Sequence, residues 1–258
     1  MITVQQLQTL CRIAEAAGHE IMTVYAKRGG VWKKDDASPL TEADLRADRV
    51  IRDGLETHFP GLFIWSEESV SSYQDDVQTF FLVDPLDGTK EFLKRNGEFT
   101  VNIALVHNGV PLAAVVFAPA LDELYYAAVG LGAYKRDAEG TRPIATHVDQ
   151  ELSLRVMGSR SHGGDKLSVW LTTVSVPYTF IAAGSSLKFC RIAEGQADIY
   201  PRFGPTSQWD TAAAHCILEV AGGAVLDLSG QSLRYGLDCP VLNPEFVAVG
   251  NRSLIRLI

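Results

Sequence analysis

The chain has 258 residues, of which 47% are hydrophobic and 21% are charged, and its formal net charge is −8 at pH 7. This composition predicts a globular protein with a sizeable core, in one large domain or in two closely packed halves. The negative charge argues against a broad surface for binding a nucleic acid polymer. No run of residues approaches the ~18 apolar positions of a transmembrane helix, and the first residues show no signal peptide.

The four cysteines are widely spaced and form no Cys-x-x-Cys pair. This spacing argues against a disulfide framework and against a zinc site. Free thiols in a reducing cytosol are the simpler expectation. We therefore expect a cytoplasmic protein.

Two helices are predicted in the first part of the chain. Apolar residues recur at helical spacing from Val4 to Val24, which predicts an amphipathic helix over residues 3–27. A polar loop is expected at residues 29–39, followed by a second helix over residues 41–58. The inward-facing apolar residues of that second helix are predicted to be Leu45, Ile51 and Leu55.

Strand signals dominate the segment that follows. Short apolar runs at residues 62–66 and 80–84 end in polar or acidic side chains. The β-rich runs at 100–106 and 110–117 are separated by His107-Asn108-Gly109, and Asn-Gly in this setting is a strong hairpin signal. The remaining predicted elements are strands at 124–129, 132–135, 154–159, 178–182, 225–228 and 246–249, and helices at 187–194 and 210–220.

Blocks of strands beside helices predict a layered α/β (α+β) architecture. Residues 136–150 are polar and form a soft boundary. We expect residues 1–145 to form a helix pair and an antiparallel sheet that carries most of the acidic site. Residues 146–258 are expected to form an α/β half with substrate-binding loops.

The segment Asp84-Pro85-Leu86-Asp87-Gly88-Thr89 is the strongest functional signal. Pro85 restricts the backbone between two aspartates and Gly88 permits a sharp bend, so both carboxylates and the Leu86 carbonyl can point to one place. Hard oxygen ligands suit Mg²⁺, whereas zinc prefers His or Cys. An ordinary turn would use the same residue types, and that alternative stays open here.

Carboxylates also lie at three other strand ends or helix starts. Glu67 and Glu68 follow the predicted strand at 62–66, where adjacent glutamates are by themselves typical of a solvated loop. Asp210 alone is most simply the N-cap of the helix that follows. Asp44 belongs to a Thr-x-x-Asp capping box that starts at Thr41. Because a helix N-terminus also binds phosphate oxygens, capping and catalysis can coexist.

Together these segments resemble the inositol monophosphatase superfamily, which uses E-E, D-P-(I/L)-D-G-T and W-D in this order. The resemblance spans about residues 35–250 and implies the layered αβαβα sandwich of the inositol monophosphatase and fructose-1,6-bisphosphatase type. Within the superfamily the chain is most similar to the bacterial 3′(2′),5′-bisphosphate nucleotidase branch. That likeness is carried by SPLT (38–41), DPLDGTKEF (84–92), NGEFTVNIA (96–104), GSSLKF (184–189) and YPRFGPT (200–206).

The resemblance implies a magnesium-dependent, lithium-sensitive phosphatase. Its expected reaction is hydrolysis of the 3′-phosphate of adenosine 3′,5′-bisphosphate to AMP and phosphate, which clears a by-product of sulfate assimilation. Two or three Mg²⁺ per site are implied, with Mn²⁺ as a substitute. The expected partner is a small phosphorylated nucleotide and no nucleic acid polymer, and the protein would be a monomer or homodimer, either free in the cytoplasm or peripheral at the inner membrane. An inositol or sugar monophosphatase is the alternative.

The resemblance also assigns roles to individual residues. Asp44 and Thr89 would form a catalytic pair that orients and deprotonates a metal-bound water. Glu68 would support the metal ligand Glu67 without binding the metal itself. The implied metal ligands are Glu67, Asp84, the carbonyl of Leu86, Asp87 and Asp210. The implied substrate-binding residues are Glu67, Leu86, Asp87, Gly88, Thr89, Ser159, Arg160, Gly184, Ser185, Ser186, Lys188, Arg202 and Asp210.

Arg202 is the residue that we expect to decide substrate choice. Allowing one residue of gap, it takes the place of a glutamate that accepts hydrogen bonds from sugar hydroxyls in inositol-selective relatives. A fixed cation there would favour a second phosphate over a polyol. A surface arginine that pairs with a nearby acid is the open alternative.

Other classes of protein fit less well. Ser185-Ser186-Leu187-Lys188 matches the S-x-x-K motif of penicillin-recognising enzymes, but S-D-N and K-T-G are missing. The sequence has no phosphate-binding loop of the G-x-x-x-x-G-K-[ST] type. A non-catalytic magnesium–nucleotide binding protein remains an alternative, although metal binding alone would need neither Asp44 nor Thr89.

Overall fold

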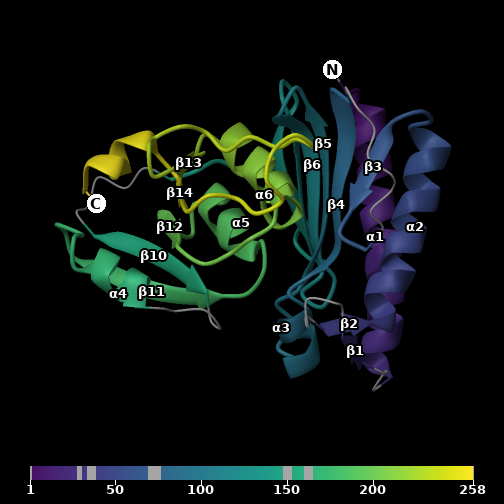
Figure 1. The fold of residues 1–258 in the computed structure, drawn as a ribbon, viewed down its shortest axis with the longest axis horizontal. Coiled ribbons are helices and arrows are strands. Elements are labelled where there is room, and N and C mark those ends of the chain that lie inside the picture. The colour runs from purple at the N-terminus through teal and green to yellow at the C-terminus, as the bar shows by residue number, and fades with distance from the viewer. Residues whose placement is uncertain are drawn as a thin grey trace.

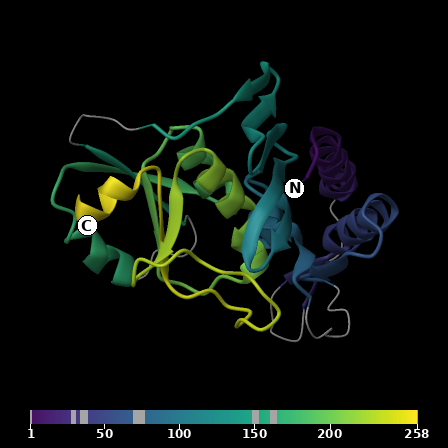
Figure 2. The same ribbon diagram turned by 90° about the horizontal axis from the view of Figure 1, so that it is seen from above.

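The computed structural model of the protein describes residues 2–27, 31–33, 39–68, 77–147, 153–159 and 165–257. The described residues form five layers of alternating helices and sheets (Figure 1). A view turned by 90° shows the two N-terminal helices on one side of the large sheet and the second half of the chain on the other (Figure 2). The expected layered α/β sandwich is therefore confirmed.

The first two layers are a helix pair and a seven-stranded sheet. The helices are α1 (Val4–Ala26) and α2 (Glu42–His58), both close to their predicted ranges. The sheet has the strand order β3-β4-β5-β6-β7-β8-β9 and is antiparallel except for the parallel pair β3–β4. Its strands are β3 (Phe63–Ser66), β4 (Thr79–Asp87), β5 (Thr100–His107), β6 (Val110–Ala118), β7 (Glu123–Ala128), β8 (Gly132–Asp137) and β9 (Gly140–Pro143).

The other three layers come from the second half of the chain. Helices α5 (Leu187–Ala193) and α6 (Gln208–Val220) lie between the two sheets in Figure 1. The second sheet has the strand order β11-β10-β12-β14-β13. Its strands are β10 (Leu154–Ser159), β11 (Tyr178–Ala183), β12 (Ile199–Arg202), β13 (Ala224–Asp227) and β14 (Phe246–Val249), with α4 (Asp165–Leu171) and a 3₁₀ helix (Arg252–Leu257) on its outer side.

Small residues let the helix pair approach the large sheet closely. The buried face of α2 contains Ala43, Ala47, Ile51 and Leu55 at a spacing of four, which is one stripe of an α-helix. Leu45 does not belong to this stripe and is 45% exposed, so its predicted inward position is wrong. Asp44 and Asp48 of α2 are also buried, and the hydroxyl of Ser66, the last residue of β3, donates to Asp48 Oδ1.

Two local predictions have different outcomes. The hairpin is confirmed, because Asn108 and Gly109 both adopt positive φ, at 48° and 77°, between β5 and β6. The expected polar loop at 29–39 is partly wrong: β1 (Val31–Lys33) pairs with β2 (Pro39–Thr41). Residues 34–38 lie outside the described residues. Elements of three to seven residues, such as β1, β9 and α4, are too short to give a clear periodicity.

One hydrophobic cluster connects the two sheets through α6. It includes Leu82 of β4, Ala213 and Ile217 of α6, and Tyr200 and Phe246 of the second sheet. Alanines on both sides of α6 allow this helix to pack between two sheets. The packing brings the first turn of α6, which carries Asp210, close to the ends of β3 and β4.

Candidate metal-dependent active site

An irregularity at the end of β4 orients its two aspartates. Asp84 pairs with Asn102, and Asp87 pairs with Thr100. Over this stretch β4 therefore contains one residue more than β5. In a regular strand, residues three apart would point to opposite faces, and the extra residue removes that opposition. The backbone N–H of Leu86 donates to Asp84 Oδ1 at 3.0 Å, which closes the turn.

Gly88 carries the chain from β4 into α3 (Thr89–Lys94). Its φ is 89°, and a Cβ atom there would lie 3.2 Å from the Glu98 carbonyl oxygen and 3.3 Å from Ser185 Cβ. Only glycine fits this position without strain. The turn leaves the Thr89 hydroxyl 3.4 Å from the Leu86 carbonyl oxygen, so these two predicted site residues lie together.

Two other acidic residues, Asp44 and Asp210, lie at helix starts, each in a capping box. Thr41 caps α2, and its backbone N–H donates to Asp44 Oδ2 at 2.8 Å, as predicted. The N-cap of α6 is Ser207, not Asp210, so that prediction is wrong. Asp210 is the third residue of the helix and accepts the Ser207 N–H at 2.8 Å.

Three carboxylates meet where these elements converge. Glu67, Asp84 and Asp210 offer oxygen atoms that all lie within 4.8 Å of one another. Burial, followed by repulsion from Glu67 and Asp87, raises the pKa of Asp84. Burial, followed by repulsion from Asp87 and Glu67, raises the pKa of Asp210 to about 8. The cluster offers carboxylate oxygens as ligand atoms, so a hard divalent cation fits it.

Asp87 is held beside the cluster by side chains from two other elements. Its Oδ2 accepts from the Ser186 backbone N–H at 2.7 Å and from Asn102 Nδ2 at 3.4 Å. The Ser186 hydroxyl lies 2.9 Å from Asp87 Oδ2 and 2.8 Å from the Asp210 carbonyl oxygen. Ser186 thus joins the end of β4 to the starts of α5 and α6. Sequence reasoning missed Asn102, although a lone amide on an otherwise apolar strand was a signal.

Asp44, one member of the predicted catalytic pair, lies in the first turn of α2. Asp44 is 1% exposed, and its charge contributes to the raised pKa of Asp84 after the larger effects of burial, Glu67, Asp87 and Asp210. Its Oδ2 accepts from the Thr41 hydroxyl at 2.5 Å. The proton transfer assigned to Asp44 and Thr89, and the role of Glu68, stay predictions.

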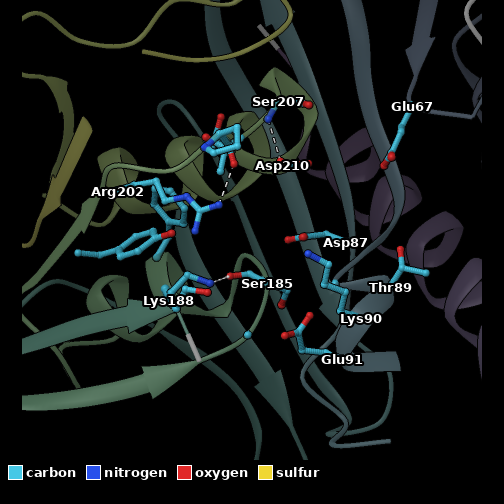
Figure 3. A pocket seen from close by; sticks show the side chains of 18 of the residues that line it. Glu67, Asp87, Thr89, Lys90, Glu91, Ser185, Lys188, Arg202, Ser207 and Asp210 are labelled. Carbon is cyan, nitrogen blue, oxygen red and sulfur yellow. Dashed lines mark hydrogen bonds between the residues drawn. The ribbon is translucent and has the colours of Figure 1, made fainter. Parts of the chain in front are cut away.

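A cavity of about 370 Å³ opens beside the acidic cluster (Figure 3). Asp84 and Leu86 lie behind the cavity wall, each 1% exposed, and Arg160 lies outside the described residues. Sequence reasoning missed Lys90, Tyr200 and Thr206, which line the cavity and belong to segments already singled out. The predicted residues that line it are Glu67, Asp87, Gly88, Thr89, Ser159, Gly184, Ser185, Lys188, Arg202 and Asp210.

The side chains of Lys188 and Arg202 donate hydrogen bonds to backbone carbonyls of the protein. The Lys188 amine donates to the Ser185 carbonyl and lies 5.2 Å from the centre of the Tyr200 ring. Burial lowers the pKa of Lys188 to about 8, with the charge of Asp87 acting in the opposite direction. Arg202 donates through Nε and Nη2 to the carbonyls of Gly204 and Pro205, at 3.2 and 2.8 Å.

The alternative for Arg202, a surface residue paired with an acid, does not match this geometry. Its side chain lines the cavity, and the hydrogen bonds described for it go to backbone carbonyls. Arg202 therefore orders the turn that leads to Ser207 and Asp210. Figure 3 shows its guanidinium on the cavity wall.

The fold and the sequence together define the class of this protein. The sequence model of the inositol monophosphatase family matches residues 4–254, and the chain belongs to that family. It is 48% identical to the 3′(2′),5′-bisphosphate nucleotidase CysQ of Salmonella typhimurium, over 93% of this chain and 98% of that protein. The CysQ protein of Escherichia coli K12 is 46% identical over the same shares, 93% and 98%.

A solved structure supports the same relationship. The crystal structure of CysQ from Bacteroides thetaiotaomicron, a bacterial member of the inositol monophosphatase family, superposes with a TM-score of 0.85. The two sequences are 36% identical, and the match covers 95% of this chain and 97% of that one. Among the described helices, none combines the length and the apolar composition that a membrane-spanning helix requires.

We expect Mg²⁺ to stabilise the protein more strongly as the pH rises from about 6 to 8. In the metal-free protein the pKa of Asp210 is raised to about 8. A carboxyl group with a raised folded-state pKa binds its proton more tightly in the folded state, so the metal-free protein loses stability as the pH rises from the unfolded pKa toward 8. Below pH 8 a cation must displace this proton, so its apparent affinity should rise about tenfold per pH unit.

Thermal unfolding at pH 6, 7, 8 and 9 measures this effect. The gain in Tm between EDTA and a fixed Mg²⁺ concentration should increase up to about pH 8 and then level off. Each tenfold gain in affinity is worth about 1.4 kcal/mol when the metal is in excess, or roughly 3–5 °C for a chain of this size. A gain in Tm that is independent of pH would contradict the assignment of Asp210 as a metal ligand in the acidic cluster.

Proposed function

We propose that this protein is a Mg²⁺-dependent phosphatase that hydrolyses the 3′-phosphate of adenosine 3′,5′-bisphosphate to AMP and phosphate. The observation that carries the proposal is the oxygen-only cluster of Glu67, Asp84 and Asp210 beside a cavity lined by Lys188 and Arg202. A cation site next to fixed cationic side chains suits a substrate with two phosphates. The activity named for the relatives supports the choice of substrate.

The residues that would hold Mg²⁺, or Mn²⁺ in its place, are Glu67, Asp84, the Leu86 carbonyl, Asp87 and Asp210. When bound, the metal neutralises phosphate oxygens and lowers the pKa of a water. Ser186 keeps Asp87 in place through its N–H and hydroxyl.

Proton transfer is assigned to the pair of Thr89 and Asp44. In this scheme the Thr89 hydroxyl takes a proton from the attacking water while it passes its own proton to Asp44, a buried carboxylate. Positioning and charge neutralisation suffice for in-line attack on a phosphate monoester. No serine or cysteine nucleophile is needed, and the S-x-x-K match at Ser185 has no role in this scheme.

Release of phosphate from adenosine 3′,5′-bisphosphate tests the proposal. We expect turnover with Mg²⁺, its loss in EDTA, inhibition by Li⁺, and AMP as the nucleoside product identified by chromatography. Inositol 1-phosphate and a sugar phosphate form the comparison panel. Preferred hydrolysis of the inositol substrate would support the alternative activity within the family, and metal binding without turnover would support the non-catalytic alternative. A cytoplasmic role in clearing a by-product of sulfate assimilation belongs to the same proposal.

A further inference from the structure

Three cationic side chains line the cavity among the described residues, and they come from three different elements. Lys90 belongs to α3, Lys188 to α5 and Arg202 to β12. The protein as a whole is acidic, with a net charge of −8. Cations gathered beside an acidic cluster therefore indicate a site that receives a negatively charged ligand.

Lys90 differs from the other two cations in its exposure to solvent. Lys188 is 5% exposed and its amine donates to a backbone carbonyl. Arg202 uses two of its N–H groups to order the turn at residues 204–205. The Lys90 side chain is exposed, and it begins at the second residue of α3, next to Thr89. A long, exposed ammonium side chain can adjust to a ligand at a small cost in strain.

The direction of Lys90 follows from the turn before it. Gly88 has a left-handed conformation and is packed against the Glu98 carbonyl and Ser185, so the start of α3 has little freedom. In Figure 3 the amino group of Lys90 points into the cavity beside Asp87, and Arg202 lies on the other side of the cavity. Cationic groups thus border the space next to the acidic cluster from two sides.

We propose that Lys90 is a specificity-determining residue that, together with Arg202, holds the phosphate of the substrate that is not hydrolysed. This inference rests on the function proposed above and deepens it. Metal ions held by the acidic cluster would neutralise the reacting phosphate, whereas a second phosphate away from them would need fixed cations of the protein. Arginine can bind such a phosphate through two parallel N–H groups, and the lysine ammonium adds a point charge from the opposite side.

The substitution Lys90→Gln tests the inference with two substrates. For adenosine 3′,5′-bisphosphate, KM should rise about ten- to a hundredfold with little change in kcat, because a charge-assisted contact is lost. For adenosine 3′-monophosphate, which lacks the second phosphate, KM should stay within about twofold of the wild-type value. Lys94→Gln is the matched control, because Lys94 is exposed on the same helix and does not line the cavity.

A binding measurement gives a readout that does not depend on turnover. AMP keeps the phosphate that is not hydrolysed, so calorimetric titration of AMP into the protein in EDTA should show weaker binding for Lys90→Gln than for wild type or Lys94→Gln. Raising the salt concentration should reduce the wild-type affinity more than that of the variant, since one ionic contact is missing there.

The outcomes separate this inference from the proposed function. Equal losses of kcat/KM on both substrates would place Lys90 at the reacting phosphate and overturn the inference. A higher Mg²⁺ requirement would place Lys90 at the acidic cluster and overturn the inference too. An unchanged KM for the bisphosphate would overturn it as well. If the wild-type protein itself shows no preference for the bisphosphate over the monophosphate, the proposed substrate is wrong, whatever the variant does.

Discussion

Replacing Asp210 by asparagine is expected to lower kcat on the order of 10³-fold and to weaken Mg²⁺ binding strongly. Asp210 is one of the three carboxylates whose oxygens lie within 4.8 Å of one another, and asparagine removes its negative charge. The start of α6 should survive, because the amide oxygen can still accept the N–H of Ser207 that Asp210 accepts at 2.8 Å.

The stability of the metal-free Asp210→Asn variant should change in the opposite direction to its activity. The raised pKa of Asp210 arises from burial and from repulsion by Asp87 and Glu67. Removing this charge relieves the repulsion, so in EDTA at pH 8 the variant should unfold at the same temperature as wild type or higher. Added Mg²⁺ should raise its Tm less than that of wild type.

Asp53→Asn, an exposed position of α2, controls for the change in net charge. It should keep wild-type turnover and the wild-type response to Mg²⁺. Near-normal turnover of Asp210→Asn, or a normal gain in Tm with Mg²⁺, would show that Asp210 only takes part in the capping box of α6 and holds no metal.

Replacing Thr89 by alanine is expected to lower kcat by about 10²–10⁴-fold, the usual range for loss of general-base assistance. The Thr89 hydroxyl lies 3.4 Å from the Leu86 carbonyl oxygen, a long contact that contributes little to the turn. Metal binding, measured by calorimetric titration, should therefore stay close to that of wild type. The effect should fall on kcat rather than on KM.

Thr89→Ser is the matched variant, since it keeps the hydroxyl and loses only a methyl group. It should recover most of the turnover that Thr89→Ala loses. If Thr89→Ala lost the metal while turnover per bound metal stayed normal, Thr89 would be a part of the metal site and the assigned proton transfer would be wrong.

Local sequence patterns were sufficient to predict most elements and several site residues. The turn from Asp84 to Thr89 depends on the restricted backbone of Pro85 and the positive φ of Gly88, both of which are properties of the residues themselves. The Thr41 capping box and the Asn108-Gly109 hairpin are equally local. For this reason they could be predicted without knowing what packs against them.

The resemblance to the inositol monophosphatase superfamily supplied what local patterns could not. Adjacent glutamates at 67–68 are by themselves typical of a solvated loop. Their place in a metal site depends on segments that are distant in the sequence, and the family pattern was the only signal in the sequence that connected them. The family match over residues 4–254 and the oxygen cluster that includes Glu67 agree with that grouping.

Long-range packing decided the rest. An alanine-rich α6 between two sheets brings Asp210 to β3 and β4, and Ser186 hydrogen-bonds to residues of both β4 and α6. Lys90 of α3 and Arg202 of β12 line one cavity, although they are distant in the sequence. The sequence by itself thus determined the turns, the caps and the kinds of ligand atoms, because these depend on neighbouring residues. Apart from the grouping that the family resemblance implied, the tertiary structure decided which charges share a site, because distances between remote segments are set by the packing of the core.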